Sequence, residues 1–525
     1  MVGADTVVEA LGGRARPEAG SDGSARLAKE SVLSLGGSVF AGALSLVIPV
    51  IVTRQLSAAD AGIYFEAVAL FMVLLSVGTL GADTGVLRSL PAALARGESG
   101  AVPLYLKTAV WLPVCWAGGI GLTLVVAAPY LSDLLLHAAP DHESTLVACI
   151  YIVAAALPIA VAYLVTMAAT RGLHSIRMLV LVDKLGKSAV QLILVAGAVL
   201  IAESAGGAVA GWVIAYGAGL IVVICWLGAY FRRNVRSSAT EVPRSERIAL
   251  VRAFWRFSLP RAGAQLCNVA MQRVDVLLVG ALLGPADAAL YAAATRFVVL
   301  GGLLAQSIQQ VMAPKISTAV AAEQHDDARE IYQTTTAWLT LVAWPMYLVA
   351  VNFPALLLGV FGEEYRTAWP AVVILCLTML VATACGPVDT VLLMAGRSLL
   401  SLQNAIVALA VMVVIDLVLI PSIGISGAAI GWASALAVKN LLALVQVRGI
   451  MSMHPFGMAF RTAAGLAVAC YGLIPFITVR TMGESGFALI VSLVVSGSLS
   501  VVLLARNLSA LRLDSARRLW RSRQN

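Results

Sequence analysis

The sequence predicts an all-α integral membrane protein with about 14 transmembrane helices. Three observations predict this fold class: the composition, the spacing of long apolar runs, and the distribution of basic residues between those runs. Of the 525 residues, 60% are hydrophobic and only 12% are charged, and the mean hydropathy is +0.91. Soluble domains are charged at roughly one residue in four, so this chain lacks the polar surface that a water-soluble fold needs.

A helix that crosses a bilayer needs about 20 mainly apolar residues. Runs of this kind predict helices at 31–54, 60–83, 103–130, 145–170, 177–202, 208–231, 254–283, 288–313, 333–358, 367–394, 399–421, 425–448, 459–480 and 486–506.

The basic residues between these runs predict that both termini lie in the cytoplasm. With the amino terminus inside, the outward segments hold only Arg54, Arg366 and Arg480, and the inward segments collect the other loop Lys and Arg residues. Cytoplasmic loops of membrane proteins carry this excess. The net charge of +8 therefore reflects topology, and we expect no nucleic-acid partner.

A long basic linker divides the chain into parts that we expect to act as separate units. They are a disordered cytoplasmic tail at 1–30, an N-lobe of six helices at 31–231, the basic cytoplasmic linker at 232–253, a C-lobe of six helices at 254–448, an extra helix pair at 459–506 and a basic cytoplasmic tail at 507–525.

A repeated phrase supports the two-lobe division. "LSAADAGIYFEA" at 56–67 and "LGPADAALYAAA" at 283–294 share Leu, Ala, Asp, Tyr and a final Ala in register. Each copy lies at the outward turn between the first and second helix of its lobe, which predicts a parallel internal repeat. We expect Asp60 and Asp287 to begin helices, where a carboxylate suits the dipole, and Tyr64 and Tyr291 to lie at the membrane interface.

Polar residues form a stripe along the seventh predicted helix. The spacings 4, 3, 4 and 3 place five side chains within about 80° of one helix face, and these are Arg261, Gln265, Asn268, Gln272 and Asp275. Polar helix–helix packing is one interpretation. An Arg, an Asp and three amides on one face favour a hydrated cavity, because ionisable groups in hydrocarbon usually face a cavity or a partner.

Other charged residues also fall inside apolar runs. Arg273 is turned about 200° from Asp275 on the same helix, so the two are not expected to pair. Arg296, about two turns into the eighth helix, needs an anion, which is either a phosphate or a carboxylate such as Asp275. Helix five carries Lys184, Lys187, Ser188 and Gln191 in a narrow arc.

Signatures of catalysis are weak. "LGKS" at 185–188 lacks the upstream glycine of a phosphate-binding loop and lies in an apolar helix. The seven cysteines contain no CxxC pair and indicate neither a disulfide framework nor a metal site. We therefore expect a transporter without catalytic residues, cofactor or metal, and not an enzyme.

Several phrases resemble the polysaccharide-transporter family of the multidrug/oligosaccharidyl-lipid/polysaccharide (MOP) exporter superfamily, which includes Wzx-like flippases. They are "RQLSAADAGIYFEAVALF", "GTLGADTGVLRSLP", "FSLPRAGAQLCNVAMQRVDVLLVG", "MAPKIS", "VFGEEYRTAWPAVVILCL" and "IPSIGISGAAIG". The resemblance spans about residues 31–447 and omits the last two helices.

The resemblance implies two six-helix lobes in a V shape, as in the multidrug exporters, with a cationic cavity between them. It also implies alternating access that moves a polyprenyl-diphosphate-linked oligosaccharide across a bacterial cytoplasmic membrane for capsule, O-antigen or exopolysaccharide assembly. The first lobe departs from the expected charge, because the position that matches Arg296 is Ala69. Membrane lipids, polysaccharide polymerase and export machinery are the further partners that the resemblance implies.

Candidate residues follow from the stripe, the buried charges and the resemblance together. The substrate-binding candidates are Arg261, Gln265, Asn268, Gln272, Arg273 and Arg296. The candidates for coupling to Na⁺ or H⁺ are Glu66 and Asp275. Lys184 and Lys187 are candidates for contact with lipid phosphate at the inner leaflet. The alternatives within transport are a lipid II flippase and a multidrug exporter, and outside it a membrane-embedded glycosyltransferase or polymerase, or an assembly scaffold.

Overall fold

The computed structural model describes residues 46–96, 98–135, 142–173, 176–234, 243–322 and 324–507, with residues 42, 44 and 511. The tail predicted at 1–30 lies outside the described residues. So do most of the first predicted helix before residue 46, the middle of the basic linker, and the tail from 508 onward except residue 511. The described part is helical and contains no strand, which confirms the all-α prediction.

The first half of the chain forms helices in the order expected from its apolar runs. After a short helical segment at Leu46–Gln55, the elements are α3 (Ala58–Gly78), α4 (Ala82–Ala95), η1 (Ser99–Ala101), α5 (Val102–Leu135), α6 (Glu143–Gly172), α7 (Ile176–Met178), the π-helical η3 (Leu179–Lys187), α8 (Ser188–Ala202) and α9 (Ala205–Asn234).

The second half begins with a helix of 40 residues and ends with an additional helical hairpin. The elements are α10 (Arg244–Leu283), α11 (Pro285–Ala294), α12 (Arg296–Ala321), α13 (His325–Asn352), α14 (Pro354–Leu358), η4 (Glu364–Ala368), α15 (Trp369–Ala384), α16 (Val388–Met394), α17 (Ser398–Ile423), α18 (Ile425–Met451), α19 (Met458–Ala467), η5 (Val468–Leu473), α20 (Ile474–Met482) and α21 (Gly486–Arg506).

Twelve helices in the described part are long and apolar enough to cross a membrane. The other two predicted spans correspond to Leu46–Gln55, of which only the end is described, and to the α11–α12 pair. The prediction of a multi-helix membrane fold is therefore confirmed.

Local backbone chemistry interrupts two of the predicted helices. The predicted helix at 367–394 is divided between α15 and α16, where Gly386 has φ +66° and Pro387 follows. A positive φ favours glycine and proline cannot continue a helix that began before it without losing a hydrogen bond. The helix predicted at 60–83 ends at Gly78, and after Gly81 (φ +70°) the chain starts the separate helix α4.

The seventh helix starts earlier than its apolar run. Helix α10 begins at Arg244, inside the segment expected to be linker, whereas the apolar run predicted a start at 254. The added turns carry Arg247 and Arg252 beside Phe254, which is buried. An apolar run does not reveal a polar extension of the same helix, because residues outside the membrane can be helical without being apolar.

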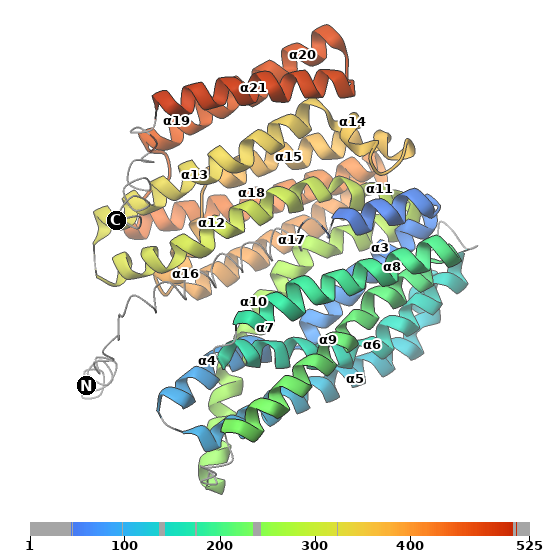
Figure 1. Ribbon diagram of the computed structural model, residues 1–525, viewed down its shortest axis with the longest axis vertical. Helices are drawn as coiled ribbons and strands as arrows, with labels where there is room; N and C mark the ends of the chain where they lie inside the picture. Colours follow the sequence, from blue (N-terminus) through green and yellow to red (C-terminus); the bar gives the residue numbers. More distant parts are fainter. Residues whose placement is uncertain are drawn as a thin grey trace.

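The helices gather in two groups that meet along α3 and α10 (Figure 1). On one side α6 packs against both α5 and α9, and on the other side α12, α13, α15, α18 and α17 pack in succession. Helix α3 packs against α10 and α11, and α10 also contacts α4 and α5. The hairpin of α19, η5, α20 and α21 packs on α13 at the edge of the molecule, away from α5 and α6 (Figure 1). The interface between lobes is therefore built around α3 and α10.

The two copies of the repeated phrase meet at this interface, where Gly62 lies against the backbone of Pro285. Asp60 and Asp287 lie in the first turns of α3 and α11, as expected from the helix dipole. The placement of both tyrosines near the membrane interface stays a prediction. Tyr64 and Tyr291 are both buried within the protein.

Candidate functional site

A cavity of about 240 Å³ lies between the lobes. Its walls come from α3, η3, α8 and α9 on one side and from α10 and α12 on the other. Three of its lining side chains are cations, namely Lys187, Arg273 and Arg296. The full lining is Leu44, Ile48, Pro49, Tyr64, Phe65, Val68, Met72, Lys187, Ser188, Gln191, Trp212, Tyr216, Arg273 and Arg296.

Arg296 enters the cavity because the chain breaks between α11 and α12 at Thr295, which places Arg296 at the first position of α12. Its guanidinium lies 5.4 Å from the ring centroid of Phe65, within the range of a cation–π contact. Its Nε atom is buried, and no hydrogen-bond partner for it lies among the described residues.

The alternative partner for Arg296, Asp275, is committed elsewhere. Tyr291 donates its hydroxyl to Asp275 Oδ2 at 2.7 Å, and the Val276 backbone N–H donates to Oδ1 at 2.8 Å. Arg273 lies on another face of α10 and lines the cavity, as the angle of about 200° between the two side chains implies. Within the described part of the chain, neither guanidinium has a carboxylate oxygen within 4.0 Å.

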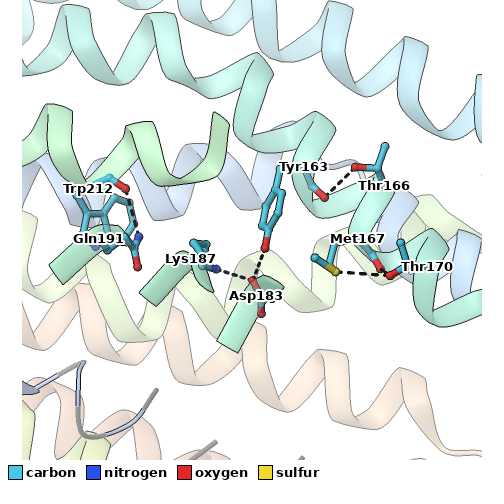
Figure 2. Close-up of polar contacts among 8 residues, drawn as sticks. All are labelled: Tyr163, Thr166, Met167, Thr170, Asp183, Lys187, Gln191 and Trp212. Carbon is cyan, nitrogen blue, oxygen red and sulfur yellow. Dashed lines mark hydrogen bonds and ion pairs between the residues drawn. The ribbon is translucent and has the colours of Figure 1, made fainter. Parts of the chain in front are cut away.

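Lys187 is the third cation, and its surroundings differ from those of the two arginines. Its ammonium lies 2.6 Å from Asp183 Oδ1, and Tyr163 donates its hydroxyl to the same oxygen at 2.9 Å (Figure 2). The ammonium also lies 5.4 Å from the ring centroid of Tyr163 and 4.9 Å from that of Tyr216. One turn further on, Gln191 donates to the Trp212 carbonyl at 3.2 Å (Figure 2).

The two lysines predicted to meet lipid phosphate thus lie in different places. Lys187 lines the cavity between the lobes, whereas Lys184 does not. Both belong to η3, where the π-helical backbone changes the direction of successive side chains relative to an α-helix.

The polar stripe of α10 divides among several environments. Arg261, Gln265 and Gln272 are exposed, and none of them lines the 240 Å³ cavity. Asn268 accepts a hydrogen bond from Lys439 of α18 at 2.8 Å, and the Lys439 ammonium is 4.0 Å from Asp389. The stripe therefore includes helix–helix bonds as well as exposed amides, and among the described residues of α10, Arg273, beside the stripe, is the one that lines the cavity.

Two further carboxylates are buried, one at the contact between α3 and α10 and one between α17 and α18. Glu66 is 1% exposed, and neither of its oxygens has a hydrogen-bond partner among the described residues. It lies against Gly280 of α10, where a Cβ would come within 2.3 Å of Glu66 Oε1. Asp416 of α17 is likewise buried without a described partner, against Gly431 of α18.

At the end predicted to face outward, one arginine joins the lobes. Arg54 donates from Nε to the Val360 carbonyl at 2.8 Å and from Nη2 to the Gly359 carbonyl at 2.7 Å. Both carbonyls follow α14 in the second half of the chain. From the sequence, Arg54 was notable only as one of three basic residues in the outward segments. In the structure it forms hydrogen bonds between the two lobes.

The prediction from the sequence did not include Asp183 or the aromatic residues of the cavity wall. Asp183 precedes Lys187 by four residues, and this spacing, visible in the sequence, places opposite charges on one helix face. The orientation of Tyr216 toward the cavity and of Tyr163 toward Asp183 depends on how α6, α9 and η3 pack together, which no single-helix pattern shows.

Comparisons with known proteins agree with this architecture. The profile of the family described as "Polysaccharide biosynthesis protein" matches residues 27–320, and the MatE profile matches residues 260–422. No curated protein matches the chain.

Solved structures share the fold at low sequence identity. A lipid II flippase MurJ in an inward closed conformation is 13% identical, with a TM-score of 0.70, over 91% of this chain and 99% of that one. An inward-facing multidrug resistance MATE family transporter of the MOP superfamily is 14% identical, with a TM-score of 0.66, over 80% and 98% of the two chains. A MOP superfamily transporter from Pyrococcus furiosus is 16% identical, with a TM-score of 0.53, over 81% and 96%.

The first profile covers more than half of the chain and the fold is that of the MOP transporters. This chain therefore belongs to the polysaccharide biosynthesis protein family and is a multi-pass membrane protein whose fold is shared with solved transporters of the MOP superfamily.

Proposed function

We propose that the protein is a flippase that moves a polyprenyl-diphosphate-linked oligosaccharide across the bacterial cytoplasmic membrane by alternating access, for exported polysaccharide assembly. One observation carries the proposal. Lys187 from one lobe and Arg273 and Arg296 from the other meet at one cavity, and the two guanidinium groups have no carboxylate partner among the described residues.

The chemistry of these cations suits a diphosphate. Guanidinium groups bind phosphate oxygens in bidentate fashion, and attraction between opposite charges is stronger at a partly buried site than in bulk water. A cavity lined by both lobes also suits alternating access, since movement of one lobe against the other exposes the same cations to either side.

Other parts of the chain supply contacts beyond the diphosphate. The exposed amides of Gln265 and Gln272, with Arg261, extend along α10 beyond the cavity, where sugar hydroxyl groups would meet them. Asn268 would join them only after releasing Lys439. Glu66 and Asp275 are the proposed sites of coupling to an inward H⁺ or Na⁺ gradient, because both are buried at or beside the contact between α3 and α10.

Lipid II also carries a polyprenyl diphosphate, so a lipid II flippase is the second candidate that the same cavity supports. A multidrug exporter of cationic compounds is not favoured by three cations in the cavity wall. Localisation in the cytoplasmic membrane with both termini inside follows from the loop charges and belongs to this proposal, as does a partnership with polysaccharide polymerase.

Purified full-length protein in liposomes tests the proposal. The assay supplies a fluorescent polyprenyl-diphosphate oligosaccharide, lipid II, or the same polyprenol without the diphosphate, and measures the arrival of each at the opposite leaflet. We expect the first lipid to cross faster than in protein-free liposomes and the lipid without diphosphate to cross at the background rate. Faster transfer of lipid II alone would assign the second function, and background rates for every lipid would refute flipping.

A further inference from the structure

Lys187 is paired with a carboxylate, whereas the other two cavity cations have no carboxylate partner in the part of the chain that the structure describes. Asp183 lies one turn before Lys187 and is not part of the cavity lining. The pair is largely enclosed, with side-chain exposures of 15% for Lys187 and 25% for Asp183. Charge-assisted bonds at such distances are stronger than neutral hydrogen bonds, so the ammonium is held toward Asp183 and its charge is offset there.

Asp183 itself is anchored independently of the lysine. The Tyr163 hydroxyl of α6 donates to the same carboxylate oxygen that Lys187 contacts (Figure 2). If the ammonium turns toward the cavity, Asp183 keeps this hydrogen bond, and the Tyr216 ring remains beside the lysine side chain. An ammonium has three N–H donors, so Lys187 can donate to a phosphate oxygen in place of Asp183. Asp183 then still accepts the hydrogen bond from Tyr163.

The backbone under this pair is unusual. Residues Leu179–Lys187 form a π-helix, a conformation that is rare and often marks functional positions. The wide turn depends on Gly186, because a Cβ there would fall 2.9 Å from the Leu181 carbonyl oxygen. The ion pair between Asp183 and Lys187 thus lies in a segment whose backbone geometry differs from that of the regular helix that follows it.

We propose that Asp183 is a positioning residue that restrains Lys187 and sets the anion affinity of the cavity. In the empty cavity Asp183, anchored by Tyr163, holds the lysine and offsets its charge. A phosphate group that enters between Arg273 and Arg296 competes with Asp183 for the ammonium and recruits Lys187 as a third cation. The inference rests on the proposed function, because the competing anion is the diphosphate of the substrate.

Calorimetric binding of inorganic pyrophosphate to the purified full-length protein in detergent tests this role. Asp183→Asn is expected to tighten binding about five- to tenfold, which corresponds to ~1–1.4 kcal/mol, because it frees the lysine. Lys187→Met is expected to weaken binding by a similar factor. The decisive measurement is the double variant, in which Asp183→Asn should change the affinity of the Lys187→Met protein by less than about twofold.

The double variant separates restraint from direct repulsion. If Asp183 acted only as a negative charge near the anion, its removal would tighten binding equally with and without Lys187, and that result would overturn the proposal. An unchanged or weakened affinity of the single Asp183→Asn variant would overturn it as well. Lys184→Met is the matched control, because it removes a neighbouring positive charge that does not line the cavity.

A second variant covers the case in which Asp183→Asn does not fold. Asp183→Ser replaces the asparagine variant if the latter does not elute as a single species in size-exclusion chromatography, and the same tightening of pyrophosphate binding is expected.

The outcomes also distinguish this inference from the proposed function. Failure of the unmodified protein to bind pyrophosphate would refute the anion site of the proposed function. Binding by the unmodified protein without any effect of Asp183 would refute only the restraint.

Discussion

Gly62 of α3 and Pro285 at the start of α11 approach so closely that a Cβ on Gly62 would lie 1.7 Å from the Pro285 carbonyl oxygen. Each residue belongs to one copy of the repeated phrase, so the internal repeat places its two copies against each other across the lobe interface. In the alternating-access cycle that we propose, this contact would have to break for the cavity to open toward that end.

Gly62→Ala is therefore expected to shift the protein toward a conformation in which this contact is open. Overpacking of this kind costs ~1–3 kcal/mol, enough to change the ratio of two conformations about five- to 150-fold. Spin labels on the exposed residues Gln55 and Ala286 should report a larger population at long distance. Gly118→Ala is the control, because no atom beyond its own stretch of helix lies within 4 Å of the added Cβ. Identical distance distributions for both variants would contradict the role of the contact.

Arg54→Ala should loosen the same end of the molecule by a different route. The guanidinium donates to the carbonyls of Gly359 and Val360, and these bonds are exposed, so their loss is expected to cost about 1 kcal/mol. The same pair of spin labels should show an increase of about fivefold in the open population. Arg54→Lys, which can keep one of the two bonds, should give an intermediate value. No change in either variant would show that the contact does not hold the lobes.

Arg296→Ala tests whether this residue serves binding or structure. Its Nε has no partner among the described residues, so removal of the side chain leaves no described carboxylate unpaired. We expect pyrophosphate affinity to fall about tenfold or more while the melting temperature stays within a few degrees of that of the unmodified protein. Arg296→Lys should restore part of the affinity, since it keeps the charge and loses the bidentate geometry. A collapse of stability with unchanged affinity would assign Arg296 a structural role.

Glu66→Gln tests gradient coupling. The carboxyl group is buried against Gly280 at the contact between α3 and α10, and an amide of the same shape can neither release a proton nor balance a cation. We expect transport driven by an H⁺ or Na⁺ gradient to fall to the rate without a gradient, while exchange between equal substrate pools continues. Asp275→Asn, measured beside it, distinguishes the two candidate carboxylates. Full gradient-driven transport by the Glu66→Gln protein would remove Glu66 from the mechanism.

The sequence predicted the helices well because lipid imposes a simple requirement: about 20 apolar residues in each span. It also indicated Arg273, Arg296 and Lys187 as charges inside apolar helices, since charge in an apolar run is visible without a structure. It did not predict which of them share a cavity, because a helical wheel shows which residues share a face and not which neighbour that face meets.

The surroundings of other side chains could not be predicted for the same reason. Tyr64 and Tyr291 are buried within the protein, and which helices cover them is not visible in a single helix. Asn268 shares a face with Gln265 and Gln272, yet Lys439 from α18 reaches only Asn268. The π-helical turn before Lys187 depends on Gly186, whose requirement becomes apparent only from the position of the Leu181 carbonyl.

The central claim is that the cations of the lobe interface carry a lipid-linked diphosphate across the membrane. The most direct test is the liposome translocation rate of the labelled polyprenyl-diphosphate oligosaccharide with the combined Arg273→Ala and Arg296→Ala variant, compared with Arg480→Ala outside the cavity. We predict at least a tenfold loss (~1.4 kcal/mol or more) for the double variant and an unchanged rate for the control. A double variant that is normally folded and flips the lipid at the rate of the unmodified protein would contradict the account.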